Sequence, residues 1–210
     1  EILDRSAQDP VHVHESVRKL RLSAAHLLSI INDILDLSRI ESGKVSIKEE
    51  PFCLSELIDN VSGIIRTQAD AKHHTFDIHI HDLWNDHLCG DWTRLNQVLI
   101  NILNNAVKYT RPFGQINFEI MESPSQREGY VSLCFQVRDN GIGMSKEFQK
   151  QLFQPFSRED NSMTNVTQGT GLGLSIVKNI LELHDAAYGV WSEEGKGSIF
   201  WFELSLATES

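Results

Sequence analysis

The sequence predicts an α+β fold in which a mixed β-sheet packs against helices as a two-layer sandwich, preceded by a long bundle-forming helix. Segments with a helical period and segments that alternate apolar and polar residues are interspersed along the chain. The alternating segments form hairpins rather than regular β-α-β units, which favours a mixed sheet. Hydrophobic residues make up 40% of the 210 residues, so the chain can bury a sizeable core.

Residues 10–43 are predicted to form the long helix, with Asp9 and Pro10 at its start and Gly43 at its end. Apolar residues recur there at spacings of three and four, as in a heptad seam. The seam consists of Val17, Leu20, Ala24, Leu27, Ile31 and Ile34, widened by Leu28 and Leu35. A single helix cannot bury such a stripe. It packs either on its own domain or, as we favour, on a partner helix, which includes one from a second subunit.

The remaining strands and helices are predicted from the periodicity of apolar residues and from the polar, glycine and proline residues between them. Strands are predicted at 44–52, 75–81, 114–121, 130–139, 188–192 and 197–206. Helices are predicted at 54–69, 91–108, 145–152 and 171–184. The core face of the first consists of Leu54, Leu57, Ile58, Val61, Ile65 and Ala69, and that of the second of Leu95, Val98, Leu99, Ile102, Leu103 and Ala106. The polar stretches 122–129 and 157–170 are predicted to be loops.

Charge and cysteine content limit the functional classes. A net charge of −10 gives no general attraction to nucleic acid or to an anionic membrane, so we expect neither as a partner. No run of about 18 apolar residues is present, so we expect no membrane span. The three cysteines are far apart, which favours a reducing compartment such as the cytoplasm. Since the sequence begins with Glu1 rather than Met, we expect it to be part of a longer protein.

A carboxylate followed by two glycines ends one predicted strand, in VRDNGIGM (137–144). Asp139 at the end of a buried strand is costly unless a group donates a hydrogen bond to it, and the exocyclic amine of a base would serve. Gly141 and Gly143 would let the backbone approach a flat ligand. The alternative is an ordinary Asp-Asn-Gly turn, and this motif alone does not separate the two.

The predicted helix 91–108 carries polar residues beside its apolar face. Asn101, Asn105 and Lys108 are spaced i, i+4 and i+7, so they share one side of the helix. Amide oxygens suit Mg²⁺, which also takes phosphates and waters as ligands. The alternative is a solvated helix flank, which the poor helix propensity of asparagine weakens.

A glycine-rich loop, QGTGLGLSIVK (168–178), precedes the last predicted helix. The spacing of Gly169, Gly171 and Gly173 misses a dinucleotide-binding motif by one position, and a polar stretch rather than a strand precedes it. The glycines instead open a helix whose free N–H groups and positive dipole end favour phosphate. The polar stretch before them would be a mobile lid.

Together these motifs resemble the ATP-binding half of a sensor histidine kinase from two-component signalling. The family's N box, first glycine box, F box and second glycine box correspond to NQVLINILNNAVKYT (96–110), DNGIG (139–143), FQPF (153–156) and GTGLGL (169–174). Residues 27–45 resemble the second helix of the family's dimerisation hairpin. The resemblance implies a Bergerat-type ATP-binding fold. We therefore expect residues 1–44 to be part of the dimerisation and phosphoacceptor hairpin and 45–210 to be the ATP-binding catalytic domain.

The resemblance also implies roles for individual residues. Adenine would be read by Asp139 and lined by Gly141 and Gly143. Asn105 would coordinate Mg²⁺ with help from Asn101. Lys108 and Arg158 would reach phosphate, Tyr109 would lie near the base or ribose, and Phe153 and Phe156 would anchor the lid. The residues around the phosphates would be Gly169, Thr170, Gly171, Leu172 and Gly173.

Two positions bear on the reaction. Related ATPases carry a general-base glutamate where this chain has Asn101, and a neutral amide is a poor base for water. Transfer to a histidine fits better, because the acceptor brings its own nucleophile. The family's acceptor segment is missing here, and His14 does not fit it, so the acceptor would lie on an upstream hairpin helix.

The resemblance thus predicts an ATP- and Mg²⁺-dependent protein histidine kinase module that does not autophosphorylate on its own. Its partners would be a second copy through the N-terminal helix, the upstream histidine-bearing helix and a response-regulator receiver domain. We expect this part in the cytoplasm, whether or not the parent protein is anchored in the inner membrane. The alternative is a catalytically silent dimerising regulatory module of a signalling protein.

Overall fold

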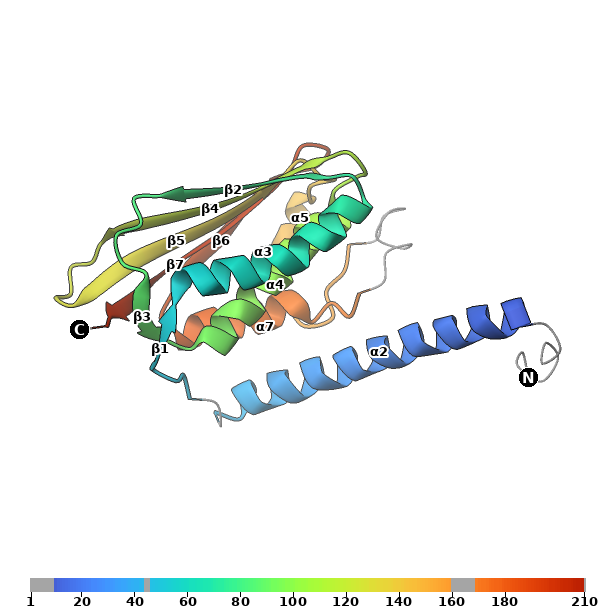
Figure 1. Cartoon of the computed structure of the whole chain (residues 1–210), viewed down its shortest axis with the longest axis horizontal. Helices are drawn as coiled ribbons and strands as arrows, with labels where there is room; N and C mark the ends of the chain where they lie inside the picture. Colours follow the sequence, from blue (N-terminus) through green and yellow to red (C-terminus); the bar gives the residue numbers. More distant parts are fainter. Residues whose placement is uncertain (1–9, 44–45, 160–168, 210) are drawn as a thin grey trace.

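The computed structural model describes residues 10–43, 46–159 and 169–209 (Figure 1). Its helices are α2 (Pro10–Glu41), α3 (Leu54–Ala71), α4 (Trp92–Tyr109), α5 (Lys146–Gln149) and α7 (Gly173–Leu183). Its strands are β1 (Glu50–Cys53), β2 (Thr75–His81), β3 (His87–Gly90), β4 (Gln115–Pro124), β5 (Tyr130–Asp139), β6 (Ala187–Glu193) and β7 (Gly197–Thr208). Among the described helices, none is both long and apolar enough to cross a membrane.

The strands form one mixed sheet in the order β1-β3-β7-β5-β4-β2. Strands β2 and β4 are parallel, and the other pairs are antiparallel. Strand β7 is long enough for β6 to pair along its first half while β3 pairs at its far end, where Leu88 lies opposite Thr208. Helices α3, α4 and α7 cover one face of this sheet (Figure 1). The predicted two-layer fold is confirmed.

The core lies between the sheet and these helices. Phe118, Phe135 and Phe202 come from three neighbouring strands, and their rings stack at centroid distances of 6.4 and 4.8 Å. All the apolar residues predicted for the inner faces of α3 and α4 are buried. Removing each leucine, isoleucine or valine side chain of these faces from water is worth about 1.5–3 kcal/mol, so the periodic faces fix how the two helices lie on the sheet.

Several predicted boundaries are wrong. Strand β1 begins only at Glu50, because it pairs solely with the four-residue strand β3, which the sequence analysis missed. Strand β4 runs on to Pro124, three residues into the predicted loop 122–129. The buried carboxylate of Glu122 holds this end by accepting from the backbone N–H groups of Trp84 and Asn85 at 2.9 and 3.0 Å. Helices α5 and α7 are shorter than predicted.

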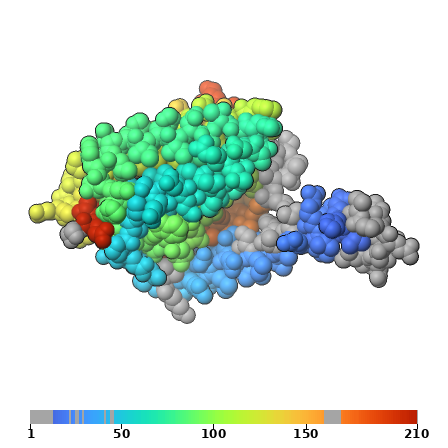
Figure 2. Space-filling model, viewed as in Figure 1, coloured from blue at the N-terminus to red at the C-terminus, as the bar shows by residue number. Residues whose placement is uncertain are grey.

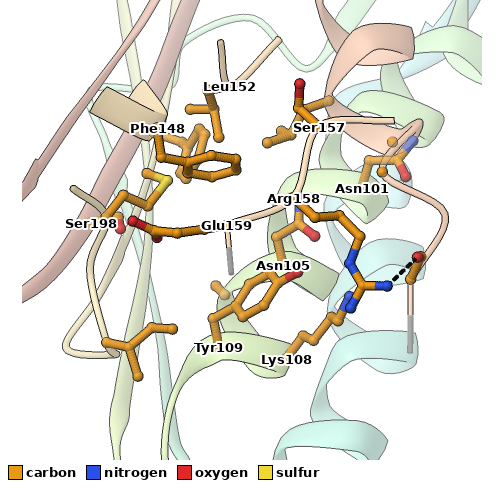
Figure 3. A pocket seen from close by; sticks show the side chains of 18 of the residues that line it. Asn101, Asn105, Lys108, Tyr109, Phe148, Leu152, Ser157, Arg158, Glu159 and Ser198 are labelled. Atoms are coloured by element: carbon orange, nitrogen blue, oxygen red, sulfur yellow. Dashed lines mark hydrogen bonds between the residues drawn. The ribbon is translucent and has the colours of Figure 1, made fainter. Parts of the chain in front are cut away.

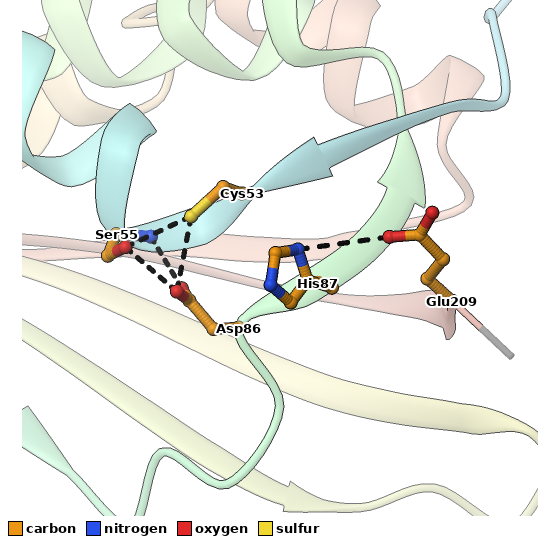
Figure 4. A network of polar contacts seen from close by, with 5 residues as sticks. All are labelled: Cys53, Ser55, Asp86, His87 and Glu209. Atoms are coloured by element: carbon orange, nitrogen blue, oxygen red, sulfur yellow. Dashed lines mark hydrogen bonds and ion pairs between the residues drawn. The ribbon is translucent and has the colours of Figure 1, made fainter.

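The N-terminus of α3 is capped by a residue distant in sequence (Figure 4). The carboxylate of Asp86 accepts from the backbone N–H of Ser55 at 2.7 Å and from its hydroxyl at 2.9 Å. The Cys53 thiol donates to the same carboxylate at 3.1 Å. Burial raises the pKa of Asp86, but these hydrogen bonds outweigh it and hold the pKa below its usual value. The cap ties α3 to the start of β3.

Helix α2 ends at Glu41, and the predicted stop residue Gly43 follows in a turn, with a φ of +65° and a hydrogen bond from its N–H to Ile40 O. Its start at Asp9 lies outside the described residues. The C-terminal half of α2 lies beside α7, and the rest extends past the domain (Figures 1 and 2). Leu37 and Ile40 are buried there. The predicted heptad seam is exposed throughout, so the part of the chain that the structure describes does not bury it.

Candidate functional site

A cavity of about 280 Å³ opens among α2, α4, α7 and the segment that follows β5 (Figure 3). It is lined by Asp33, Asn101, Asn105, Ala106, Lys108, Tyr109, Asp139, Ile142, Gly143, Met144, Phe148, Leu152, Ser157, Arg158, Glu159, Gly169, Thr170, Gly171, Gly173, Leu174, Ser198 and Phe200. The two ends differ in character. Phe148, Leu152 and Ser198 lie at one end, and Asn101 and Arg158 lie at the other (Figure 3). The cavity therefore suits a ligand with an apolar and a polar part.

Helix α4 supplies the polar side of the cavity. Its spacing brings Asn101, Asn105 and Lys108 to one side, as predicted, and all three line the cavity. The Lys108 ammonium lies 4.7 Å from the centre of the Tyr109 ring, and a Cβ on Gly169 would overlap it. The lysine thus reaches the glycine-rich loop.

The apolar end holds a buried carboxylate. Asp139 is only 8% exposed at the end of β5, opposite Ser198 of β7, and its Oδ1 accepts from Gly141 N at 2.8 Å. Burial raises the pKa of Asp139 to about 6, although hydrogen bonds from the backbone N–H groups of Gly141 and Ser198 pull it down. A carboxylate kept in this place at such a cost is a candidate for binding a ligand's hydrogen-bond donor.

Glycine is required around this carboxylate. Gly143 has a φ of +65°, and a Cβ there would overlap the Glu193 carbonyl. A Cβ on Gly141 would lie 2.5 Å from Tyr109 O. Both glycines therefore allow the turn after β5 to fold against its neighbours, and Gly143 leaves its own stretch of the cavity wall free of a side chain.

The glycine-rich loop closes the polar end. Gly171 has a φ of +73°, and its carbonyl accepts from Phe156 N at 3.0 Å. Thr170 Oγ1 accepts from Leu172 N at 3.1 Å. The N-cap of α7 is Leu172, whose side chain cannot accept a hydrogen bond. The positive end of this helix is therefore available to an anion in the cavity, because Gly173 lines it.

The predicted lid is described only at its two ends. Arg158 lines the cavity and donates from Nη1 to Gly169 O at 3.4 Å (Figure 3). Glu159 accepts from Ser145 N at 3.0 Å. Residues 160–168 lie outside the described residues.

Four predicted site residues do not line the cavity. Gly141 lies behind Asp139, and Leu172 is fully buried beneath the loop. Phe153 packs edge-on against Tyr188, with ring centroids 5.3 Å apart, and Phe156 is 64% exposed. Phe153 thus packs against the core, whereas the side chain of Phe156 is exposed at a φ of +62°.

Two kinds of cavity residue were not predicted from the sequence. The apolar wall includes Ile142, Met144 and Phe148, of which the first two flank Gly143 in the motif and could have been read from it. Asp33 and Ser198 come from helix α2 and strand β7, far from the motifs in sequence. No local pattern marks them, because only the folded arrangement brings them to the cavity.

The donor set fits a hard cation that brings further ligands. In the described ranges, no group of three His, Cys, Asp or Glu side chains is placed to hold a metal. An ion here would depend on amide oxygens such as those of Asn101 and Asn105 and on phosphate and water oxygens. Mg²⁺ is commonly bound in this way.

Known proteins are similar to this chain. A family model described as histidine kinase-, DNA gyrase B- and HSP90-like ATPase matches residues 90–208. The chain is 35% identical over 193 residues to the sensory/regulatory protein RpfC of Xanthomonas campestris, covering 92% of this chain and 26% of RpfC. It is 40% identical over 184 residues to the sensor protein GacS of Pseudomonas syringae, covering 88% of this chain and 20% of GacS.

A solved structure extends the similarity to the fold. Full-length ShkA in complex with AMPPNP has a TM-score of 0.77 and 30% identity, covering 94% of this chain and 39% of that chain. This chain spans only about a fifth to a quarter of the length of the curated relatives RpfC and GacS.

Proposed function

This chain belongs to the family of histidine kinase-, DNA gyrase B- and HSP90-like ATPases, and we propose that it is the ATP-binding module of a sensor histidine kinase. It would transfer the γ-phosphate of ATP to a histidine outside this chain, for relay to a response-regulator aspartate. One observation supports this most: a single cavity combines an apolar end holding Asp139 with a polar end formed by Lys108 and the glycine-rich loop. ATP has the matching two parts, an apolar adenine base and a charged triphosphate.

At the apolar end, Asp139 would accept a hydrogen bond from the adenine amino group. Its pKa of about 6 leaves it ionised at pH 7, so it is a strong acceptor in a buried place. Two backbone N–H groups hold its orientation. Ile142, Met144 and Phe148 would cover the faces of the base.

At the polar end, the ammonium of Lys108, the guanidinium of Arg158 and the N-terminus of α7 would bind phosphate oxygens. Asn105 would hold Mg²⁺ with help from Asn101, and the bound ion would neutralise charge on the transferring phosphate. We place the module in the cytoplasm, where its three free cysteines stay reduced.

The amide at Asn101 favours a kinase over an ATPase. A neutral amide cannot take a proton from water, so hydrolysis would be slow, whereas a histidine brings its own nucleophilic nitrogen. An upstream hairpin helix would carry that histidine. Through its exposed seam, α2 would pack against the upstream hairpin helix and a second copy of the chain in one helical bundle.

Nucleotide titration tests the binding step. We expect saturable Mg²⁺-dependent binding of ATP that is strongly weakened in Asp139→Asn. Phosphotransfer is then tested by supplying a histidine-containing hairpin in trans with labelled ATP. Labelling of the hairpin would exclude a silent regulatory module. ATP binding without labelling would favour the silent module, and steady phosphate release without any acceptor would indicate an ATPase.

A further inference from the structure

One carboxylate in the cavity comes from the long helix rather than from the sheet and its covering helices. Asp33 of α2 lines the cavity, and its Oδ2 accepts a hydrogen bond from Thr170 Oγ1 at 3.4 Å. Thr170 lies in the glycine-rich loop, directly before Gly171. An acidic side chain thus occupies the end of the cavity that the proposed function gives to phosphate.

Helix α2 is held to the domain at a second place. Asp36 accepts from Gln97 Nε2 at 2.9 Å and pairs with Arg94 Nη1 at 3.6 Å. Neither Arg94 nor Gln97 lines the cavity. Leu37 and Ile40 are buried beside these contacts. The helix is therefore docked by one contact inside the cavity and by a larger set outside it.

The contact inside the cavity is electrostatically opposed to nucleotide phosphate. The glycine-rich loop offers its N–H groups and helix dipole to an anion, and Asp33 already brings one charge there. Burial and the neighbouring Asp36 raise the pKa of Asp33 and outweigh the hydrogen bond from Thr170, which lowers it. A triphosphate adds several negative charges at close range, where like charges repel strongly.

We propose that docking of α2 and binding of the triphosphate oppose one another, with Asp33 as the group that senses the phosphates. Without nucleotide, Asp33 and Asp36 hold the module against α2. A bound triphosphate displaces Asp33, weakens the docking and frees the module to move toward its histidine acceptor. By linkage, the factor by which a bound triphosphate weakens docking must equal the factor by which docking weakens ATP binding. The inference rests on the proposed function, because it assumes that phosphate binds at this end.

The first test compares the affinities of Mg²⁺-ATP, Mg²⁺-ADP and adenosine. Asp33→Asn should tighten ATP binding about tenfold and ADP binding by less, because fewer phosphate charges are relieved. Adenosine affinity should not change. The control is Asp59→Asn, which removes the same charge from an exposed position of α3 outside the cavity and should alter none of the three.

Two results would overturn the inference while leaving the proposed function intact. Weaker Mg²⁺-ATP binding in Asp33→Asn would mean that Asp33 helps to hold the metal or nucleotide. An equal gain for ATP and adenosine would mean that the phosphates are not sensed. Failure of the unaltered chain to bind any nucleotide would instead contradict the proposed function.

The second test measures docking itself. Leu37 is 8% exposed, so Leu37→Cys, in a chain whose three native cysteines are replaced by alanine, should react slowly with a thiol reagent. ATP should accelerate the reaction several-fold and adenosine should not. Adding Asp36→Asn should accelerate it without nucleotide, because this change loosens the dock outside the cavity. An identical rate with and without ATP would refute the coupling.

Discussion

The buried charge of Asp139 lowers the stability of the fold at neutral pH, and its proposed role in binding adenine explains why it is there. Its folded pKa of about 6 lies above the value of about 3.9 expected for the unfolded chain. The folded state therefore holds the proton more tightly. The stability that this group contributes is fully present below the unfolded pKa and is lost as the pH rises through about 6. At neutral pH the chain keeps an ionised, buried acceptor instead of the more stable protonated one.

Asp139→Asn should separate stability from binding. Between pH 5 and pH 8 the unaltered chain should lose on the order of 1 kcal/mol of unfolding free energy that the variant keeps. The variant should bind ATP about ten- to a hundredfold more weakly, because an ionic hydrogen bond is lost. Denaturant unfolding and nucleotide titration at both pH values check this. If Asp139→Asn also had a lower unfolding free energy than the unaltered chain at pH 8, the carboxylate would be mainly structural.

Gly143 tests how tightly the wall of the cavity is built. Gly143→Ala places a Cβ into the Glu193 carbonyl at a φ of +65°. Gly195→Ala is the matched control, because Gly195 has a φ of +79° and open space around its missing Cβ. Both variants should bear the backbone strain of about 1 kcal/mol, and only Gly143→Ala should also weaken ATP binding. Equal affinities would show that the wall adjusts freely.

The candidate site is predictable from sequence where its residues lie in one motif. Asn101, Asn105 and Lys108 follow from helical spacing alone, and Gly143 from its place after Asp139. The same reasoning misplaced Phe156, because a motif gives no side-chain direction at a positive φ. Asp33 could not be found, since its position in the cavity depends on how α2 docks.

Among the elements, α3 depends on a cap that its own sequence does not provide. Asp86→Ala leaves the backbone N–H of Ser55 without its partner and should lower the unfolding free energy by about 1–2 kcal/mol at pH 7. The pKa of Asp86 is depressed, so its stabilising effect is present above the unfolded pKa and is lost as the pH falls through the folded pKa.

The pH dependence distinguishes this cap from a packing effect. The stability difference between the unaltered chain and Asp86→Ala should begin to shrink below about pH 4, where the unfolded chain takes up the proton, and should be lost as the pH falls through the folded pKa of Asp86. Asp86→Asn, which can still accept from Ser55, should lose less than the alanine variant. Denaturant unfolding at pH 7 and pH 3.5 measures both. A difference that does not change with pH would assign the loss to packing instead.

Whether an element could be predicted from the sequence depends on how often its hydrophobic pattern repeats. Helices α3 and α4 and strand β2 carry several turns or alternations, so their periods identify them. Strand β3 has four residues, too few for a period, and exists because β1 and β7 pair with it on either side. The end of β4 is similarly fixed by the contacts of Glu122 across the sheet edge.

Taken as a whole, the chain presents two opposite sides of α2 to two different partners. At about 100° per residue, the seam from Val17 to Ile34 and the docked set of Asp33, Asp36, Leu37 and Ile40 lie about 180° apart around the helix. The docked set faces α4 and α7, and the seam is exposed. Docking to the domain therefore leaves the seam free to enter a bundle.

The exposed seam predicts a dimer whose formation does not depend on docking. Residues such as Leu27 at 58% and Ile31 at 44% exposure leave a continuous apolar stripe that a helical partner would bury. Leu27→Glu places a charge inside that interface and should weaken self-association at least about tenfold. Asn32→Glu adds the same charge at an exposed position on the flank of the helix and should weaken it far less. Sedimentation across a micromolar concentration series measures both.

Nucleotide affinity decides whether the two sides of α2 act separately. Leu27→Glu leaves Asp33 and Asp36 in place, so the affinity for ATP should match that of the unaltered chain even when the dimer is lost. If the unaltered chain stayed monomeric at every concentration in the series, the seam would not be a sufficient interface. Dimer formation would then depend on the upstream hairpin helix. A change in ATP affinity on loss of the dimer would show instead that pairing and docking share contacts, because separate sides of a rigid helix transmit no such effect.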